Sequence, residues 1–281
     1  MSKIILITGA STGFGRAFAT EALRRGHSVI ATARNAARLA DLEKVAPERV
    51  MAVTLDVDHP EMMADVINAG TERFGRIDVL INNAGYGLVG ALEETSADEW
   101  QAIFRTNLFG AIEMTRAVLP VMRAQGAGDI VNISSMGGQL SWGGFSAYSA
   151  TKFALEGLSE ALADEVAPLG IRVMIVEPGA FRTDFAASAL RHMPVNPAYD
   201  ATVGETRKFA HGMNYTQPGD PVKAAKAVFD TLDGDRLPLR LALGNDVVDG
   251  IRSHAEAVLK NLTDWERISR SAVFASEPVE A

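Results

Sequence analysis

The sequence predicts an α/β protein with a doubly wound parallel sheet of about seven strands, a Rossmann fold with helices on both faces. Short apolar segments rich in Val, Ile and Leu recur along the chain, as expected for strands that are buried on both faces. Segments of helical period separate them, and this alternation implies right-handed crossovers between parallel strands. A glycine-rich segment joins the first apolar segment to the first helical one, as in dinucleotide-binding folds.

The apolar segments and the helical segments fix the expected order of elements. Strands are expected at residues 3–8, 28–33, 50–55, 79–82, 130–134, 173–177 and 239–243. Helices are expected between them, at residues 14–25, 61–74, 97–123 and 149–167. We find no internal repeat, low-complexity tract or interdomain linker, so a single Rossmann-type domain is expected over residues 1–281.

The last third of the chain departs from this rhythm. Residues 184–221 form a long mixed segment with several prolines and glycines, which is typical of a lid or binding loop, and we expect it to cover the substrate. Asp220 fits the N-cap of a helix that begins at Pro221. Residues 271–281 show no pattern and are expected to form a loose tail. A final amphipathic helix is predicted by apolar residues at helical spacing, namely Ile251, Ala255, Val258, Leu262 and Trp265.

The composition excludes several classes of function. The net charge is −8 at pH 7, so we expect no nucleic-acid partner. The chain has no cysteine, which rules out disulfides, thiolate catalysis and cysteine-based zinc sites, and its five histidines lack metal-ligand spacing, so no metal is expected. The first apolar run is too short for a signal peptide or a membrane span, and we expect a cytoplasmic protein that does not bind a membrane.

The glycine-rich segment, Thr8-Gly9-Ala10-Ser11-Thr12-Gly13-Phe14-Gly15, has the features of a dinucleotide-binding loop. Glycines let the backbone turn sharply and approach a pyrophosphate, whose charge then rests on the N-terminus of the following helix. The alternative is a tight strand-to-helix turn without a ligand. The position of the loop after the first strand and before a helix favours the dinucleotide.

The end of the second strand indicates which dinucleotide is bound. Enzymes that take NAD(H) usually carry an acidic residue about 20 positions after the loop, but none occurs between Glu21 and Asp41. Arg34 stands there instead, with Arg38 one turn further on, and a guanidinium is suited to grip a 2′-phosphate. We therefore prefer NADP(H). NAD(H) remains the alternative, with Arg34 as a solvated loop charge.

Tyr148 and Lys152 are the candidate acid–base pair. They stand four residues apart where the chain enters a helix, so their side chains share one face. A phenol titrates near pH ~10, and a neighbouring ammonium is expected to lower that pKa and prepare the proton for transfer. Ser135 follows the fifth strand, where a hydroxyl can meet a substrate carbonyl. On its own, this spacing is more often that of a surface helix pair, and the surrounding motifs are what favour the acid–base pair.

In this order, the motifs resemble the single-domain branch of the short-chain dehydrogenase/reductase family over roughly residues 3–183. Residues 8–15 resemble its cofactor loop, and Asn82-Asn83-Ala84-Gly85 resembles its strand-four motif. Asp56 resembles the acid that contacts adenine, and the segment from Pro178 to Thr183 resembles the turn that holds the nicotinamide amide. Ser134 is an alternative to Ser135, but the thirteen-residue spacing to Tyr148 favours Ser135.

The resemblance also implies the site residues. The catalytic residues would be Asn107, Ser135, Tyr148 and Lys152. The residues that contact the cofactor would be Gly9, Ser11, Thr12, Gly13, Phe14, Gly15, Arg34, Asp56, Val57, Asn83, Ala84, Gly85, Tyr148, Lys152, Pro178, Gly179, Phe181 and Thr183. In this division of labour Tyr148 transfers the proton, and Lys152 keeps the Tyr148 phenol acidic. Ser135 stabilises the developing alkoxide, and Asn107 supports a water that links Lys152 to solvent.

The function expected from these patterns is hydride transfer between NADP(H) and a small-molecule carbonyl or alcohol, apolar or aromatic in character. A non-enzymatic NADP(H)-binding regulator on the same fold is the alternative, because a fold does not fix a function. A sugar-nucleotide epimerase or dehydratase would need a different glycine spacing and a larger C-terminal domain. The family resemblance further implies a homodimer or homotetramer, with contacts through the helices at residues 97–123 and 149–167.

Overall fold

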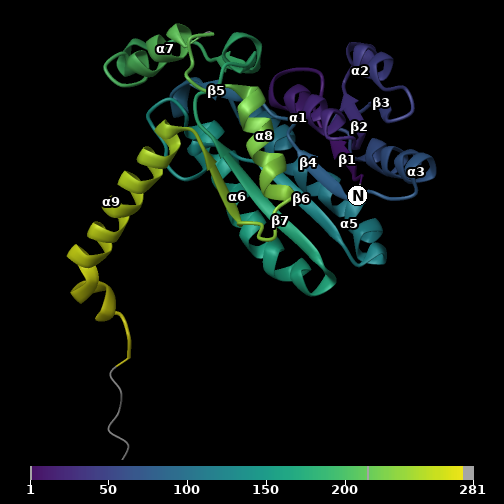
Figure 1. The fold of residues 1–281 in the computed structure, drawn as a ribbon. Helices are drawn as coiled ribbons and strands as arrows, with labels where there is room; N and C mark the ends of the chain where they lie inside the picture. The colour runs from purple at the N-terminus through teal and green to yellow at the C-terminus, as the bar shows by residue number, and fades with distance from the viewer. Residues whose placement is uncertain (1, 214, 275–281) are drawn as a thin grey trace, which may run out of the picture.

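The computed structural model describes residues 2–213 and 215–274 of the chain. Its main sheet has seven parallel strands in the order β3-β2-β1-β4-β6-β7-β9, which confirms the predicted fold class (Figure 1). The chain adds β2 and β3 on one side of β1 and then β4, β6, β7 and β9 on the other side, and this reversal of strand order is the arrangement of a Rossmann fold. The strands are β1 (Ile4–Ile7), β2 (Ser28–Ala33), β3 (Val50–Thr54), β4 (Val79–Asn82), β6 (Gly128–Ile133), β7 (Ile171–Pro178) and β9 (Arg240–Leu243).

The helices follow the predicted alternation, with local differences. The expected helix at 97–123 is two helices joined by a π-helical turn at Arg105–Phe109. Asp220 caps the helix that begins at Pro221, since its carboxylate accepts hydrogen bonds from the N–H groups of Val222 and Lys223. The helices are α1 (Gly13–Arg24), α2 (Ala40–Val45), α3 (Met63–Phe74), α4 (Ala97–Phe104), α5 (Gly110–Gln125), α6 (Ser146–Val166), α7 (Val203–Gly212), α8 (Pro221–Leu232) and α9 (Asn245–Arg270).

The expected lid segment contains structure that the sequence did not indicate. Its strand β8 (Leu190–His192) pairs in parallel with β5 (Gly87–Val89), which follows β4, and α7 comes after it. The buried pair of Arg207 with Glu94 fastens α7 to the segment before α4. Of the expected tail, residues 271–274 are exposed, and residues 275–281 lie outside the described residues.

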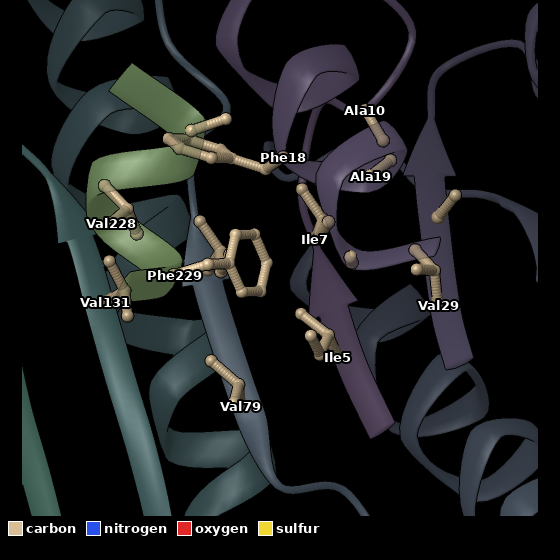
Figure 2. Close-up of a cluster of buried hydrophobic side chains, with 14 of the residues drawn as sticks. Ile5, Ile7, Ala10, Phe18, Ala19, Val29, Val79, Val131, Val228 and Phe229 are labelled. Atoms are coloured by element: carbon tan, nitrogen blue, oxygen red, sulfur yellow. The ribbon is translucent and has the colours of Figure 1, made fainter. Parts of the chain in front are cut away.

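One hydrophobic core lies between the sheet and the helices α1, α2 and α8. Figure 2 shows Phe229 of α8 pointing towards β1 and Phe18 of α1 reaching towards α8, and both rings are almost fully buried. The strands are apolar at successive positions because the opposite face of the sheet is buried as well. There a second core joins the sheet to α3, α5 and α6 through Leu6, Leu80, Met114 and others.

A buried polar network crosses the second face beneath the site described below. The side-chain amide of Asn82 donates to Asn132 Oδ1 at 2.9 Å and to Thr115 Oγ1 at 3.0 Å. Asn132 in turn donates to Ser159 Oγ at 2.8 Å. These bonds connect β4, β6, α5 and α6, and they compensate the desolvation of the amides. Across residues 2–213 and 215–274, no helix is long and apolar enough to cross a membrane.

Replacing Phe229 with Ala should destabilise the fold, because it leaves a cavity between α8, α1 and the sheet. We expect a loss of about 3–5 kcal/mol in the free energy of unfolding, measured by chemical denaturation. Phe274→Ala is the matched control, since that ring is fully exposed and its removal should change little. Equal losses in the two variants would contradict this account of the core.

Candidate active site

A crevice lies at the carboxyl edge of the main sheet, where the loops after β1, β2, β3, β4, β6 and β7 converge. It forms a cavity of about 1150 Å³. Parallel strands place all their carboxyl ends on the same edge, and ligands of doubly wound folds bind there, at the point where the strand order reverses. β8 and α7, from the segment expected to form a lid, contribute Arg191, Thr206 and Phe209 to the lining of this cavity.

The glycine loop at one end of the crevice is shaped for close approach of a phosphate. Gly13, the first residue of α1, has φ +54°, and Thr12 at the N-cap makes no side-chain hydrogen bond to the helix. A side chain on Gly15 would place its Cβ 2.3 Å from Gly9 O, so this position must be glycine. The loop therefore presents the N-terminus of α1, with its free N–H groups, to the cavity. These features fit a dinucleotide pyrophosphate.

A hydrogen-bond network holds the glycine loop against the loop after β4. Thr8 Oγ1 accepts the backbone N–H groups of Asn83 and Ala84 at 2.9 and 3.0 Å. Asn83 Nδ2 donates to Thr8 O at 2.9 Å and to Gly9 O at 3.2 Å. The two loops thus form one rigid wall, and Asn83 supports the wall as well as lining the cavity.

The end of the crevice next to β2 and β3 is lined by side chains of both charges. A ribose phosphate would meet the positive side chains, and an adenine would meet the negative one. Arg34 and Arg38 are exposed and line the cavity. Neither guanidinium forms an ion pair with another residue in the described part of the chain, whereas Arg16 nearby is paired with Asp41. Asp56 and Val57, after β3, lie on the same wall. The arginines are therefore available to an anionic group.

The turn after β7 closes the opposite wall. Phe181 packs against Phe14 of the glycine loop with ring centroids 5.1 Å apart, and Thr183 faces Gly13. Asp246, at the start of α9, accepts the backbone N–H of Ala180 at 2.9 Å and fixes the turn. This contact between residues 66 apart could not be read from the sequence pattern.

Tyr148, Lys152 and Ser135 meet in the middle of the crevice. Both α6 residues point from the same helix face, and Lys152 Nζ lies 5.8 Å from the centroid of the Tyr148 ring. Lys152 is buried and donates a hydrogen bond to Ile133 O at 2.8 Å. The Ser135 hydroxyl bonds to the Tyr148 phenol and also accepts the N–H of Gly137 at 3.0 Å. The two hydroxyls therefore lie side by side in the cavity.

The electrostatics of this group differ from the sequence-based expectation. Burial raises the pKa of Tyr148 to about 12, and only the hydrogen bond with Ser135 acts against it. The expected lowering of this pKa by Lys152 is not found in the chain alone, where desolvation of the phenolate is the largest cause of the shift. Burial also lowers the pKa of Lys152 to about 8, opposed by the negative charge of Glu156. Lys152, and not Tyr148, is thus the group of the pair that titrates near neutral pH.

Asn107 occupies the π-helical turn between α4 and α5. Its side-chain amide binds both backbone groups of Tyr86, accepting the N–H at 2.9 Å and donating to the carbonyl at 2.8 Å, and it also donates to Thr151 Oγ1 at 3.2 Å. The extra residue of a π-turn, a feature often found at functional sites, directs the amide inwards. In this structure Asn107 fastens the loop after β4 to α6. It does not line the cavity.

A buried pair of carboxylates behind Lys152 was not found by sequence reasoning. Glu156 lies one helical turn after Lys152, and Glu177 lies near the end of β7. Gln139 Nε2 donates to both, at 3.2 and 2.9 Å, and Arg240 Nε contacts both, at 2.9 and 3.3 Å. Burial raises the pKa of both carboxyls, that of Glu177 to about 7, with Glu156 as the second cause there. No local motif marks this cluster, because its members come from four separate segments.

The outer half of the crevice is mainly apolar and aromatic. The Tyr148 ring lies between Phe145 and Phe185, with centroids 6.2 and 6.0 Å away. Trp142 and Met213 line the cavity further out. Low-polarity side chains from the segment before α6 and from residues 184–221 therefore surround the phenol, which accounts for its desolvation.

The structure places nearly all of the sequence-predicted site residues in this one crevice. The exceptions are Gly15, which packs against the glycine loop, and Asn107, which lies behind the wall. The predicted residues that line the cavity are Gly9, Ser11, Thr12, Gly13, Phe14, Arg34, Asp56, Val57, Asn83, Ala84, Gly85, Ser135, Tyr148, Lys152, Pro178, Gly179, Phe181 and Thr183.

Comparison with known proteins gives one consistent family. The family model described as short chain dehydrogenase matches residues 3–194. The chain is 40% identical over 270 residues to Oxidoreductase BOA17 of Botryotinia fuckeliana, covering 96% of this chain and 98% of that protein. Among solved structures, a short-chain dehydrogenase from Streptomyces avermitilis is 52% identical, with a TM-score of 0.92 over 98% of this chain and 100% of that one. ElxO with NADP bound is 28% identical, with a TM-score of 0.74 over 89% and 100%.

The Glu156–Glu177 pair predicts a specific dependence of stability on pH. The Glu177 pKa rises from 4.5 to about 7 on folding, so the folded state holds this proton more tightly, and stability falls as pH rises from about 4.5 to about 7. Glu177→Gln removes this loss. We expect the variant to gain about 1–2 kcal/mol relative to the wild type between pH 5 and pH 8, measured by urea denaturation.

Glu160→Gln is the matched control, because Glu160 pairs with the same Arg240 from an exposed position. It should show no such gain. A difference between Glu177→Gln and wild type that stays constant from pH 5 to pH 8 would contradict the raised pKa.

Proposed function

Because the chain belongs to the short-chain dehydrogenase family, we propose that it is an NADP(H)-dependent oxidoreductase that interconverts a carbonyl and an alcohol. The observation that carries this proposal is the meeting of Ser135, Tyr148 and Lys152 in the crevice that begins at the glycine loop. A nicotinamide cofactor is supported by the related ElxO, which holds NADP. NAD(H) is the alternative cofactor.

The proposed cofactor contacts follow the length of the crevice. The N-terminus of α1 and the loop at Ser11–Gly13 would hold the pyrophosphate, Asp56 and Val57 would contact the adenine, and Arg34 would pair with the 2′-phosphate. The turn from Pro178 to Thr183 would hold the nicotinamide end. When bound, NADP(H) supplies or accepts the hydride.

Tyr148 is proposed as the general acid of reduction and the general base of oxidation. Its pKa of about 12 keeps the phenol protonated at neutral pH, ready to give its proton to an oxygen on which charge develops. Lys152, with a pKa of about 8, is mainly cationic at pH 7 and stabilises the phenolate that remains. Ser135 holds the substrate oxygen by a hydrogen bond that strengthens as negative charge builds.

The substrate is proposed to be an apolar or aromatic carbonyl compound or alcohol. Trp142, Phe145, Phe185 and Met213 line the part of the crevice next to Tyr148. Apolar side chains favour a substrate body that gains by leaving water. The complete set of serine, tyrosine and lysine in one cavity favours an enzyme over a non-catalytic NADP(H)-binding regulator.

Tyr148→Phe should leave NADPH binding intact and lower turnover by about 10²–10⁴-fold, since it keeps the ring and removes the hydroxyl that carries the transferable proton. Binding is measured by NADPH fluorescence titration and turnover by the absorbance of NADPH with a panel of ketones. Tyr199→Phe, outside the crevice, is the control and should retain activity. Undiminished turnover in Tyr148→Phe would remove this residue from the mechanism.

Arg34→Ala tests the choice of dinucleotide. Loss of a charge-assisted contact of about 1.5–3 kcal/mol should weaken NADPH binding by roughly ten- to over a hundredfold. NADH, which has no 2′-phosphate, serves as the internal control and should lose little affinity in the same variant. Equal losses for both cofactors would show that Arg34 does not read the phosphate.

A further inference from the structure

The helix α9 leaves the domain after its first turns. Val247 is buried, Asp246 fixes the turn after β7, and Gly250 lies close to Met136. Every residue from Arg252 to Arg270 is exposed. Figure 1 shows this part of the helix projecting from the body of the protein. It therefore receives no packing from its own chain in the described residues.

The projecting part carries a continuous apolar stripe. Ile251, Ala255, Val258, Leu262 and Trp265 follow one another at alternating steps of four and three residues, the heptad spacing of a paired helix. Val258, Leu262 and Trp265 are 53%, 60% and 57% exposed. Helices of this kind are marginal in water without a partner, because packing of the apolar face supplies most of their stability. We therefore expect a binding partner to pack against the stripe.

The polar face of α9 argues for a protein occupant rather than a lipid surface. Helices that lie on anionic membranes have polar faces rich in Lys and Arg. Here charges of both signs are interspersed, and Arg252, Lys260 and Arg270 each pair with an acid of the same helix. The helix carries Asp246, Asp249, Glu256, Asp264 and Glu266 against Arg252, Lys260, Arg267 and Arg270.

We propose that this stripe pairs with the same stripe of a second copy of the chain, in antiparallel orientation. In the register that overlaps the projecting segments, Trp265 lies opposite Ala255 of the second copy, so the largest side chain meets the smallest. Val258 lies opposite Leu262 of the second copy, and the two-fold axis repeats both layers. A parallel pair would set Trp265 against Trp265 and Ala255 against Ala255, which leaves one layer overfilled and one empty.

Charge complementarity supports the same register. The positions that flank the stripe on one side include Arg252, Leu259 and Glu266, at intervals of seven residues. In the antiparallel pair Arg252 of each copy approaches Glu266 of the other, and the two Leu259 side chains flank the axis. Opposite charges at such flanking positions set partner choice and orientation in paired helices. The surface is thus complementary to itself in shape and in charge.

Leu262→Lys tests whether the stripe associates. Two symmetric layers lose an apolar contact, so we expect the dissociation constant of the full chain to rise by about a hundredfold or more. Sedimentation velocity over a range of concentrations should show the particle mass halved. Thr263→Lys places the same charge on the polar face and should leave the mass unchanged. An unchanged mass in Leu262→Lys would overturn the proposal.

A charge-reversal cycle tests the partner and the orientation. Arg252→Glu and Glu266→Arg should each weaken association by about tenfold, because two symmetric pairs become repulsive. The double variant R252E/E266R should restore the wild-type constant to within about threefold. A double variant weaker than either single variant would overturn the antiparallel register. Wild-type protein that sediments with phosphatidylcholine–phosphatidylglycerol vesicles, when Leu262→Lys does not, would identify a lipid surface as the occupant and also overturn it.

Discussion

All seven strands of the main sheet run in the same direction, and the site depends on that constraint. It brings the ends of β1, β4, β6 and β7 to one edge, although their sequences are up to about 170 residues apart. The hydrogen bonds between Thr8 and Asn83 then join two of these ends into a single wall. Ser135 and the α6 pair stand next to that wall, so the proposed proton donor and the proposed cofactor loop share one cavity. The site is thus a consequence of strand direction more than of any local motif.

Burial has two opposite effects on the central pair. It makes the Tyr148 phenol a weaker acid, with a pKa of about 12, and the Lys152 ammonium a stronger acid, with a pKa of about 8. The negative charge of Glu156 keeps Lys152 from losing its proton more readily. The carboxylate cluster of Glu156 and Glu177 therefore connects the electrostatics of the crevice to the carboxyl end of β7 and to Arg240 on β9.

The sequence predicted the main sheet and most helices because buried parallel strands and amphipathic helices leave strong local patterns. It also identified the residues that line the crevice, since the glycine loop, Arg34 and the Tyr148–Lys152 spacing are local features. It missed β5 and β8, which are three residues each and exist through their mutual pairing. It treated residues 97–123 as one helix, since the π-turn at Asn107 depends on contacts with Tyr86 and Thr151. The sequence also did not predict the Glu156–Glu177 pair or the contact of Asp246 with the turn after β7, because the partners in each are distant in sequence.

We propose that hydride passes between a nicotinamide and a carbonyl carbon beside Tyr148. This transfer is tested most directly by the fate of the hydride itself, in reactions of the purified protein with an aromatic ketone and NADPH deuterated at either face of C4. The account predicts that one of the two labelled cofactors yields an alcohol with deuterium on the carbinol carbon, and that the other yields none. Alcohol without deuterium from both cofactors, or no consumption of NADPH with any ketone of a broad apolar panel, would contradict it.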